Sequence, residues 1–271
     1  KNLVQKLKQD YGFSDILSKL IISRNYDTSE IYGIKNKQKL INIFKNDKDF
    51  QKAFQILVNV INKNQNICIL GDYDVDGACA TSLLVRYFTH INQKHFFYIP
   101  DRIEDGYGAS KKLFQKLILK KPKLIIMVDC GSTSNEAIDY LNKNNIKSII
   151  IDHHDINKPH PKSDAIINPK KKLIKKESSL LCATALTYFF LDILINRTRS
   201  NFKLTNYMIY VLLATVCDVM PLRKINKIIA QNTIENFNIK DNIALEYIFN
   251  YFDLKKKLTI DDLGFLIGSN N

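Results

Sequence analysis

The chain has 271 residues, of which 45% are hydrophobic, and it carries a formal net charge of +13. This composition favours a packed fold over disorder, and no apolar run approaches the roughly 18 residues needed to span a bilayer. The positive charge suits a polyanionic partner such as nucleic acid, although lysine is also an ordinary means of keeping a protein soluble. The five cysteines are scattered and form no CxxC pair, so we expect reduced thiols and no zinc site.

Residues 1–62 are expected to form an N-terminal helical segment. Near its end, Phe50, Phe54, Leu57 and Ile61 recur at the three- and four-residue spacing that places side chains on one face of a helix. The spacing indicates a helix that leads directly into the first strand.

From residue 67 onward, short apolar runs alternate with helical patterns. The expected strands are 67–70, 96–99, 123–128, 148–151 and 165–167, and the expected helices between them are 78–89, 111–119 and 136–142. Strands that alternate with helices predict an α/β fold with a mostly parallel, doubly wound sheet. We expect this domain to span residues 63–225, but the pattern does not reveal the order of its strands.

Helical patterns dominate after Pro169. A basic stretch, KKKLIKK at 170–176, indicates an exposed linker or loop. The apolar spacing then predicts helices at 180–194, 206–216, 230–237 and 243–252. Residues 226–271 are therefore expected to form a C-terminal helical extension.

The most informative motif is GDYDVDG, which directly follows the first expected strand. Its carboxylates, Asp72, Asp74 and Asp76, would repel one another unless a cation binds between them. Gly71 and Gly77 would let the backbone turn sharply around such an ion. The alternative interpretation is a solvated acidic turn, or a helix N-cap formed by Asp76. An EF-hand is disfavoured because the loop lacks the later bidentate glutamate.

Three further motifs place acids or histidines where an apolar segment ends. They are VDCG at 128–131, DHH at 152–154 and CDVMPL at 217–222. Because parallel sheets gather the carboxyl ends of their strands at one edge, we expect the side chains of these motifs to meet in one cleft. Aspartate and histidine ligands suit Mn²⁺ or Mg²⁺. Two such ions about 4 Å apart, bridged by one carboxylate, would activate water and stabilise a phosphoryl transition state.

GDYDVDG, PDRIEDGYG, VDCG, DHH and CDVMPL occur in the order and with the spacing of the DHH phosphoesterase superfamily. Within it, the chain resembles the RecJ-like bacterial exonucleases, which digest single-stranded DNA in the 5′→3′ direction. The resemblance is strong over residues 65–225 and extends weakly to IDDLGFLIG at 260–268. It implies a phosphodiesterase core that uses two Mn²⁺ or Mg²⁺ ions to release 5′-nucleotides, in DNA repair and recombination in the bacterial cytoplasm.

The resemblance also implies roles for individual residues. The implied metal ligands are Asp74, Asp76, Asp129, His153 and Asp218. Asp129 would bridge the two ions, and His154 would touch the scissile phosphate, stabilising its charge or protonating the leaving group. Asp76, Asp129 and His154 are thus the expected catalytic residues, and Asp72 and Asp152 are expected to orient the ligands.

Further substrate contacts are expected from three residues. Arg102, in PDRIEDGYG, is a candidate clamp on a DNA phosphate, or an ordinary surface arginine. Tyr107 in the same motif would pack in a tight loop or stack on a base. Ser132 would contact a phosphate or cap the helix that follows it. The other histidines, His90, His95 and His160, are assigned no role in the site.

The resemblance sets expectations for partners and extent. Single-stranded DNA would be the substrate, replication or repair proteins such as single-strand-binding protein would be partners, and the chain would be a monomer with no membrane attachment. After Leu180 the family shows a glycine-rich turn, where this chain has LCATAL at 181–186. The resemblance also implies a second, DHHA1-like domain, and we expect the chain to stop before it. We therefore expect it to bind Mn²⁺ but to degrade DNA weakly or not at all by itself.

Two other interpretations of the sequence remain open. One is a phosphodiesterase for short oligonucleotides or cyclic dinucleotides. The other is a non-catalytic module that binds nucleic acid or a replication partner. The intact aspartate and histidine motifs argue against the second of these.

Overall fold

The chain divides into two units, Lys1–Leu40 and Ile41–Asn271. The computed structural model describes residues 2–101, 103, 108–171, 176–253 and 257–267. The first unit contains α1 (Asn2–Tyr11), α2 (Asp15–Ser23) and α3 (Thr28–Lys35). These helices bury Leu7, Phe13 and Ile21 in a small core of their own.

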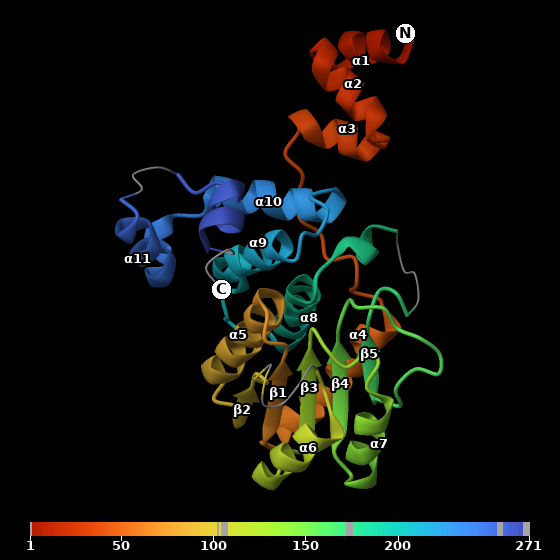
Figure 1. Ribbon diagram of the computed structural model, residues 1–271, viewed down its shortest axis with the longest axis vertical. Coiled ribbons are helices and arrows are strands. Elements are labelled where there is room, and N and C mark those ends of the chain that lie inside the picture. The colour runs from red at the N-terminus through yellow and green to blue at the C-terminus, as the bar shows by residue number, and fades with distance from the viewer. Residues whose placement is uncertain (1, 102, 104–107, 172–175, 254–256, 268–271) are drawn as a thin grey trace. The chain divides into compact units, whose positions relative to one another are not determined.

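The second unit is built on a five-stranded parallel sheet (Figure 1), as the sequence predicted. Its strands are β1 (Ile67–Gly71), β2 (His95–Tyr98), β3 (Leu124–Val128), β4 (Lys147–Ile151) and β5 (Ala165–Ile167). The strand order is β2-β1-β3-β4-β5. The chain leaves β1 toward one side of the sheet and later returns to the other side, so the topological switch point lies between β1 and β3.

Helices cover both faces of this sheet, which makes it doubly wound. The helices α6 (Lys111–Leu117) and α7 (Asn135–Lys143) pack on one face. The opposite face is covered by α4 (Lys48–Asn62), α5 (Val75–His90) and α8 (Ala183–Thr198). Successive strand residues alternate between the two faces: Cys68, Leu70, Ile125, Met127 and Ile150 belong to the core under α6 and α7. The strands read as continuous apolar runs because both of their faces are buried.

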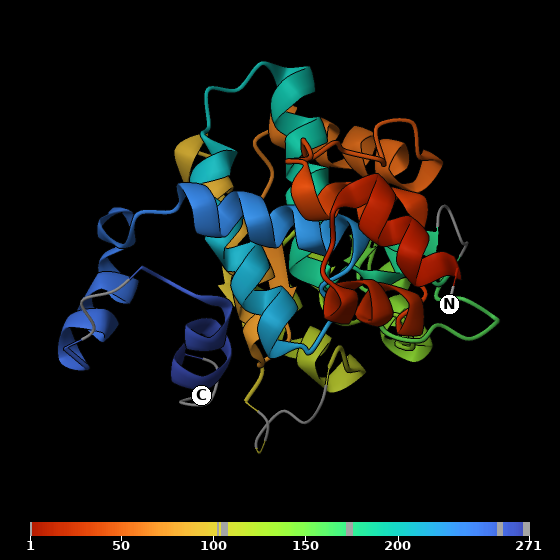
Figure 2. The same ribbon diagram turned by 90° about the horizontal axis from the view of Figure 1, so that it is seen from above.

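In the described part of the chain, three α-helices follow α8, and the first of them, α9, packs against α5 and α8. They are α9 (Met208–Cys217), α10 (Lys224–Asn236) and α11 (Ile243–Tyr251), and a π-helical segment (Asp262–Ile267) follows. Figures 1 and 2 show α10 alongside α9. Helix α10 begins six residues before the expected start at 230. Its first turn contains lysines and an asparagine, which weaken the apolar pattern in the sequence, although Ile225 and Ile229 are buried in the structure. Within the described ranges, no helix is long and apolar enough to cross a bilayer.

Two glycines let helix α5 start close to the end of β1. Neither Gly71 nor Gly77 has a positive φ angle, so the sharp turn expected of them is not what requires glycine. A Cβ on Gly77 would lie 2.6 Å from the backbone nitrogen of Asp72, and a Cβ on Gly71 would collide with the Thr81 hydroxyl. The glycines therefore permit a close approach of the two elements, and this approach places the GDYDVDG carboxylates at the edge of the sheet.

Candidate metal centre

The polar residues that follow the strands form one row because the strands end in register. Gly71 pairs with Val128, Val128 with Ile151 and Ile151 with Ile167. The backbone ladder continues one residue further, since the amides of Asp129 and Asp152 donate to the carbonyls of Ile151 and Ile167 at 2.9 and 3.0 Å. The residues next in line, from β1 to β5, are Asp72, Asp129, Asp152 and Asn168.

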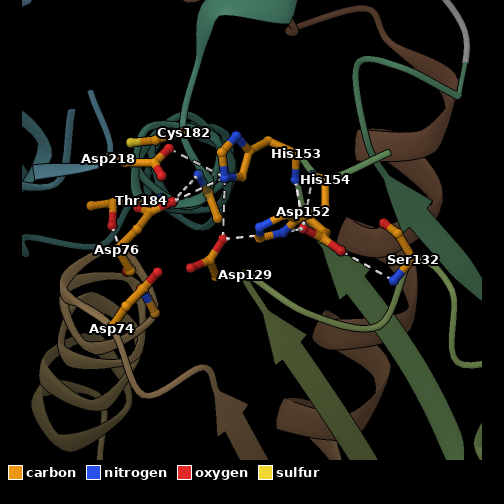
Figure 3. Close-up of polar contacts among 12 residues, drawn as sticks. Asp74, Asp76, Asp129, Ser132, Asp152, His153, His154, Cys182, Thr184 and Asp218 are labelled. Atoms are coloured by element: carbon orange, nitrogen blue, oxygen red, sulfur yellow. Dashed lines mark hydrogen bonds and ion pairs between the residues drawn. The ribbon is translucent and has the colours of Figure 1, made fainter. Parts of the chain in front are cut away.

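Three carboxylates converge on one ring nitrogen of His153 (Figure 3). His153 Nε2 lies 3.3 Å from Asp129 Oδ1, 3.4 Å from Asp218 Oδ2 and 3.6 Å from Asp76 Oδ2. Asp218 reaches this point from the end of α9, and Asp76 reaches it from the first turn of α5. The structure thus brings together side chains that are up to 142 residues apart in the sequence, from Asp76 to Asp218.

A second group of carboxylates adjoins the first. Oxygens of Asp72, Asp74 and Asp129 all lie within 4.8 Å of one another. Asp129 thereby belongs to both groups. Asp74 is exposed and also caps α5, since its Oδ1 accepts a hydrogen bond from the Gly77 amide at 2.9 Å. The capping of α5 that the sequence left open for Asp76 is therefore performed by Asp74.

The atoms of the two groups suit a divalent cation. Both carboxylate oxygens of Asp129, Oδ2 of Asp218 and Nε2 of His153 are buried, and they have no hydrogen-bond partner in the described part of the chain. Leaving buried polar atoms unpaired is costly. Two ligand atoms that each lie about 2.1 Å from one ion are roughly 3–3.5 Å apart, close to the separations around His153. This donor set of carboxylates and one imidazole fits Mn²⁺ or Mg²⁺.

The electrostatics of the cluster also favour a bound cation. Burial, together with the carboxylates of Asp76 and Asp74, raises the pKa of Asp129 to about 12. Burial raises the pKa of Asp72 and of Asp218 as well. In the absence of a metal, Asp129 therefore holds a proton at neutral pH. A divalent cation would take the place of that proton and make the same carboxylates favourable ligands.

Asp152 organises the DHH loop. Its Oδ1 accepts hydrogen bonds from the amides of His153 and His154, at 2.7 and 3.1 Å, and lies 2.8 Å from Nδ1 of His154. Burial acts to raise the pKa of Asp152, but hydrogen bonds from His154 and Ser132 lower it to about 2. The same hydrogen bond raises the pKa of His154. Because Nδ1 donates to Asp152, Nε2 is the His154 nitrogen left for a substrate.

Asn168 joins two loops of the site, and the sequence analysis missed it. Its Nδ2 donates to Ser132 Oγ at 2.8 Å and to the carbonyl of His154 at 2.9 Å. The Ser132 amide in turn donates to Asp152 Oδ2 at 3.1 Å. Helix α7 begins after Ser134, so Ser132 does not cap it. The one signal for Asn168 in the sequence is its position directly after β5, which matches that of the acids after β1, β3 and β4.

Two of the expected substrate contacts, Arg102 and Tyr107, lie outside the described residues. In the same motif Pro100 is buried, and Gly108 has a φ of +70°. Glycine is the residue that adopts this left-handed conformation without strain. The contacts of Arg102 and Tyr107 with DNA stay predictions.

The backbone turns sharply directly after Asp218. Helix α9 ends in a Schellman motif, in which the amide of Met220 donates to the carbonyl of Thr215 at 3.0 Å and that of Val219 to Val216 at 3.1 Å. This motif requires a left-handed residue, and Val219 occupies the position with a φ of +53°. A β-branched residue in this conformation is strained by roughly 1–2 kcal/mol. The strain lies next to a residue of the carboxylate cluster.

A parallel sheet with such a cluster at its strand ends is typical of a known class of proteins. The model of the DHH family, N-terminal domain, matches residues 66–215. The chain is a member of the DHH family of phosphoesterases.

Its relatives over nearly the whole chain are RecJ exonucleases. It is 28% identical to the single-stranded-DNA-specific exonuclease RecJ of Haemophilus influenzae over 99% of this chain and 49% of the relative. It is 24% identical to that of Bacillus subtilis over 96% of this chain and 32% of the relative. The chain thus spans about half, or less, of the length of these relatives.

Two solved structures have the same fold. A crystal structure of exonuclease RecJ bound to manganese matches with a TM-score of 0.73 and 24% identity, over 82% of this chain and 56% of that one. RecJ from Thermus thermophilus in complex with Mn²⁺ matches with a TM-score of 0.80 and 19% identity, over 98% of this chain and 38% of that one. At these identities the likeness establishes the fold.

Proposed function

We propose that the chain is the catalytic core of a RecJ-like 5′→3′ exonuclease that hydrolyses single-stranded DNA to 5′-nucleotides with two Mn²⁺ or Mg²⁺ ions. The observation that carries the proposal is the convergence of three carboxylates on His153 Nε2, at 3.3–3.6 Å, beside a second carboxylate group that shares Asp129. The catalytic unit is residues 63–225, and helical segments 1–62 and 226–271 flank it.

The two groups of side chains define two adjacent cation sites. Asp76, His153 and Asp218 would hold one ion, and Asp74 would hold the other with support from Asp72. Asp129 takes part in both sites, which suits a bridging carboxylate. When bound, the ions supply Lewis acidity that activates water and offsets the charge of the phosphoryl group.

His154 supplies the protein's own contact with the substrate. Its Nδ1 is held by Asp152, and 42% of its side chain is exposed, so its other nitrogen can donate to a phosphate oxygen or to the leaving group. Asp152 fixes the orientation of the ring, and Ser132 and Asn168 hold Asp152 and the His154 carbonyl in turn. Ser132 is therefore proposed to support the site through Asp152, in addition to the contact with a phosphate that the sequence analysis predicts.

Two observations support single-stranded DNA as the substrate: the activity of the relatives and the positive net charge of the chain. The relatives over nearly the whole chain are single-stranded-DNA-specific exonucleases. The net charge of +13 would attract a polyanionic strand and would make binding sensitive to salt. Arg102 and Tyr107 are proposed to contact the strand. Proteins of the replication or repair machinery are proposed as partners.

A direct test is hydrolysis of a 5′-labelled single strand and of a dinucleotide by the 271-residue chain with MnCl₂. We expect at most slow release of mononucleotides, from the 5′ end and at a higher rate from the long strand than from the dinucleotide, because the chain alone is expected to degrade DNA weakly or not at all. His154→Ala should lower the rate by about 10²–10⁴-fold and leave Mn²⁺ binding intact. His160→Ala is the matched control, because among the described residues this half-buried histidine hydrogen-bonds to the local carbonyl of Asn157, at 3.3 Å, and belongs to neither group of the cluster.

Each outcome distinguishes between the candidate functions. Faster hydrolysis of the dinucleotide would favour the small-substrate phosphodiesterase. Absence of Mn²⁺ binding in calorimetry would favour a non-catalytic module, and rapid processive digestion would contradict the expected weak activity of the chain alone. Digestion that starts from the 3′ end would contradict the proposed polarity.

A further inference from the structure

The N-terminus of α8 is capped by a residue from a different helix. The residue at the usual capping position, Cys182, makes no side-chain capping hydrogen bond within the described chain. Instead, Asp76 Oδ2 accepts from the Ala183 amide at 2.7 Å, and Asp76 Oδ1 accepts from the Thr184 amide at 2.8 Å (Figure 3). These amides are buried and need a partner. Asp76 provides it from more than 100 residues away.

Thr184 adds a third bond to the same residue. Its hydroxyl donates to the backbone carbonyl of Asp76 at 2.9 Å, and its side chain is fully buried. The backbone of Asp76 is therefore tied to α8 by the Thr184 hydroxyl, while the carboxylate is tied by two amides. The partial positive charge at the start of a sixteen-residue helix also offsets part of the carboxylate charge.

The bonds to α8 leave Asp76 able to bind a cation. Each carboxylate oxygen has two lone-pair sites, so an amide on one site of Oδ2 leaves the other free. That oxygen is the one that lies 3.6 Å from His153 Nε2. The amides therefore determine the direction in which Asp76 presents its oxygen to the cluster with His153 and Asp218.

We propose that Thr184 is a positioning residue, which acts through Asp76 to set the affinity of the Asp76, His153 and Asp218 cluster for a divalent cation. This inference rests on one part of the proposed function, namely that the cluster binds a divalent cation. Side chains that hold a metal-binding residue in place typically change metal affinity by 10–100-fold. The Thr184 hydroxyl is accordingly worth about tenfold in Mn²⁺ affinity.

The test is calorimetric titration of the 271-residue chain with MnCl₂, for the wild type and three variants. Thr184→Val has nearly the same shape without the hydroxyl, and it should weaken binding about tenfold. Thr184→Ser keeps the hydroxyl and should bind like the wild type. Thr187→Val is the matched control: this threonine is also fully buried on α8, but its hydroxyl has no hydrogen-bond partner among the described residues. Its removal should leave Mn²⁺ affinity unchanged.

The results separate the two proposals. A wild-type chain that does not bind Mn²⁺ would overturn the metal site and, with it, the role of Thr184. Wild-type binding that Thr184→Val leaves unchanged would overturn the positioning role alone. A Thr184→Ser variant that binds as weakly as Thr184→Val would assign the effect to packing and overturn it too. Should valine unfold the chain, as urea titration in EDTA would reveal, Thr184→Ala gives the same comparison.

Discussion

Replacing Asp129 with asparagine should make the metal-free protein more stable. Asp129 is fully buried, both of its carboxylate oxygens lack a hydrogen-bond partner among the described residues, and its pKa is raised to about 12. An acid whose pKa is higher in the folded state destabilises the fold progressively as the pH rises above its unfolded pKa. Asparagine has the same shape, carries no charge and avoids this penalty.

The size of the effect follows from the pH interval. Between the unfolded pKa of 3.8 and pH 7 lie roughly three pH units, and each is worth about 1.4 kcal/mol. Asp129→Asn should therefore raise the free energy of unfolding at pH 7 by at most about 4 kcal/mol. The gain should shrink as the pH falls, and at pH 4 the two proteins should be nearly equal. Relaxation of the neighbouring carboxylates makes this figure a ceiling.

Urea unfolding followed by circular dichroism, in EDTA at pH 5 and pH 7, measures the difference. Repeating it with MnCl₂ should narrow the difference, because a ligand at 100 times its Kd stabilises the wild type by about 2.7 kcal/mol, and the variant has lost a ligand. Asp139→Asn is the control, since Asp139 is exposed on α7. If Asp129→Asn were less stable than the wild type in EDTA at both pH values, the electrostatic reasoning about the cluster would be wrong.

Two other variants test the neighbourhood of the cluster. Asn168→Asp keeps the oxygen that accepts from the Lys170 amide but loses the donor to Ser132 Oγ and to the His154 carbonyl. We therefore expect kcat on single-stranded DNA to fall by about 10–100-fold, while the Mn²⁺ affinity measured by calorimetry stays within about threefold. A parallel loss of Mn²⁺ affinity would contradict this prediction. Val219→Gly should raise the free energy of unfolding by about 0.5–1 kcal/mol, because glycine relieves the left-handed strain and the replaced side chain is 85% exposed. A lower urea midpoint for Val219→Gly would show that the valine side chain makes a compensating contact.

The sequence by itself determined the secondary structure and the chemistry of the strand ends. Apolar runs such as Leu124–Val128 are local signals of buried strands, and their alternation with helices requires parallel connections. An acid directly after such a run is also visible without a structure. Parallel strands share one edge, so the meeting of Asp76, Asp129 and His153 could be expected before any coordinates existed.

Only the tertiary structure decided how these groups are held. The strand order, and the register that places Asn168 beside the acids, arise from pairing between segments that local patterns do not encode. A carboxylate in the sequence can be a ligand, a cap or both, and its partners come from elsewhere in the chain. Asp74 caps its own helix, whereas Asp76 caps α8, more than 100 residues away. A hydrogen bond depends on distance and direction, and the folded chain sets both only when distant elements pack together.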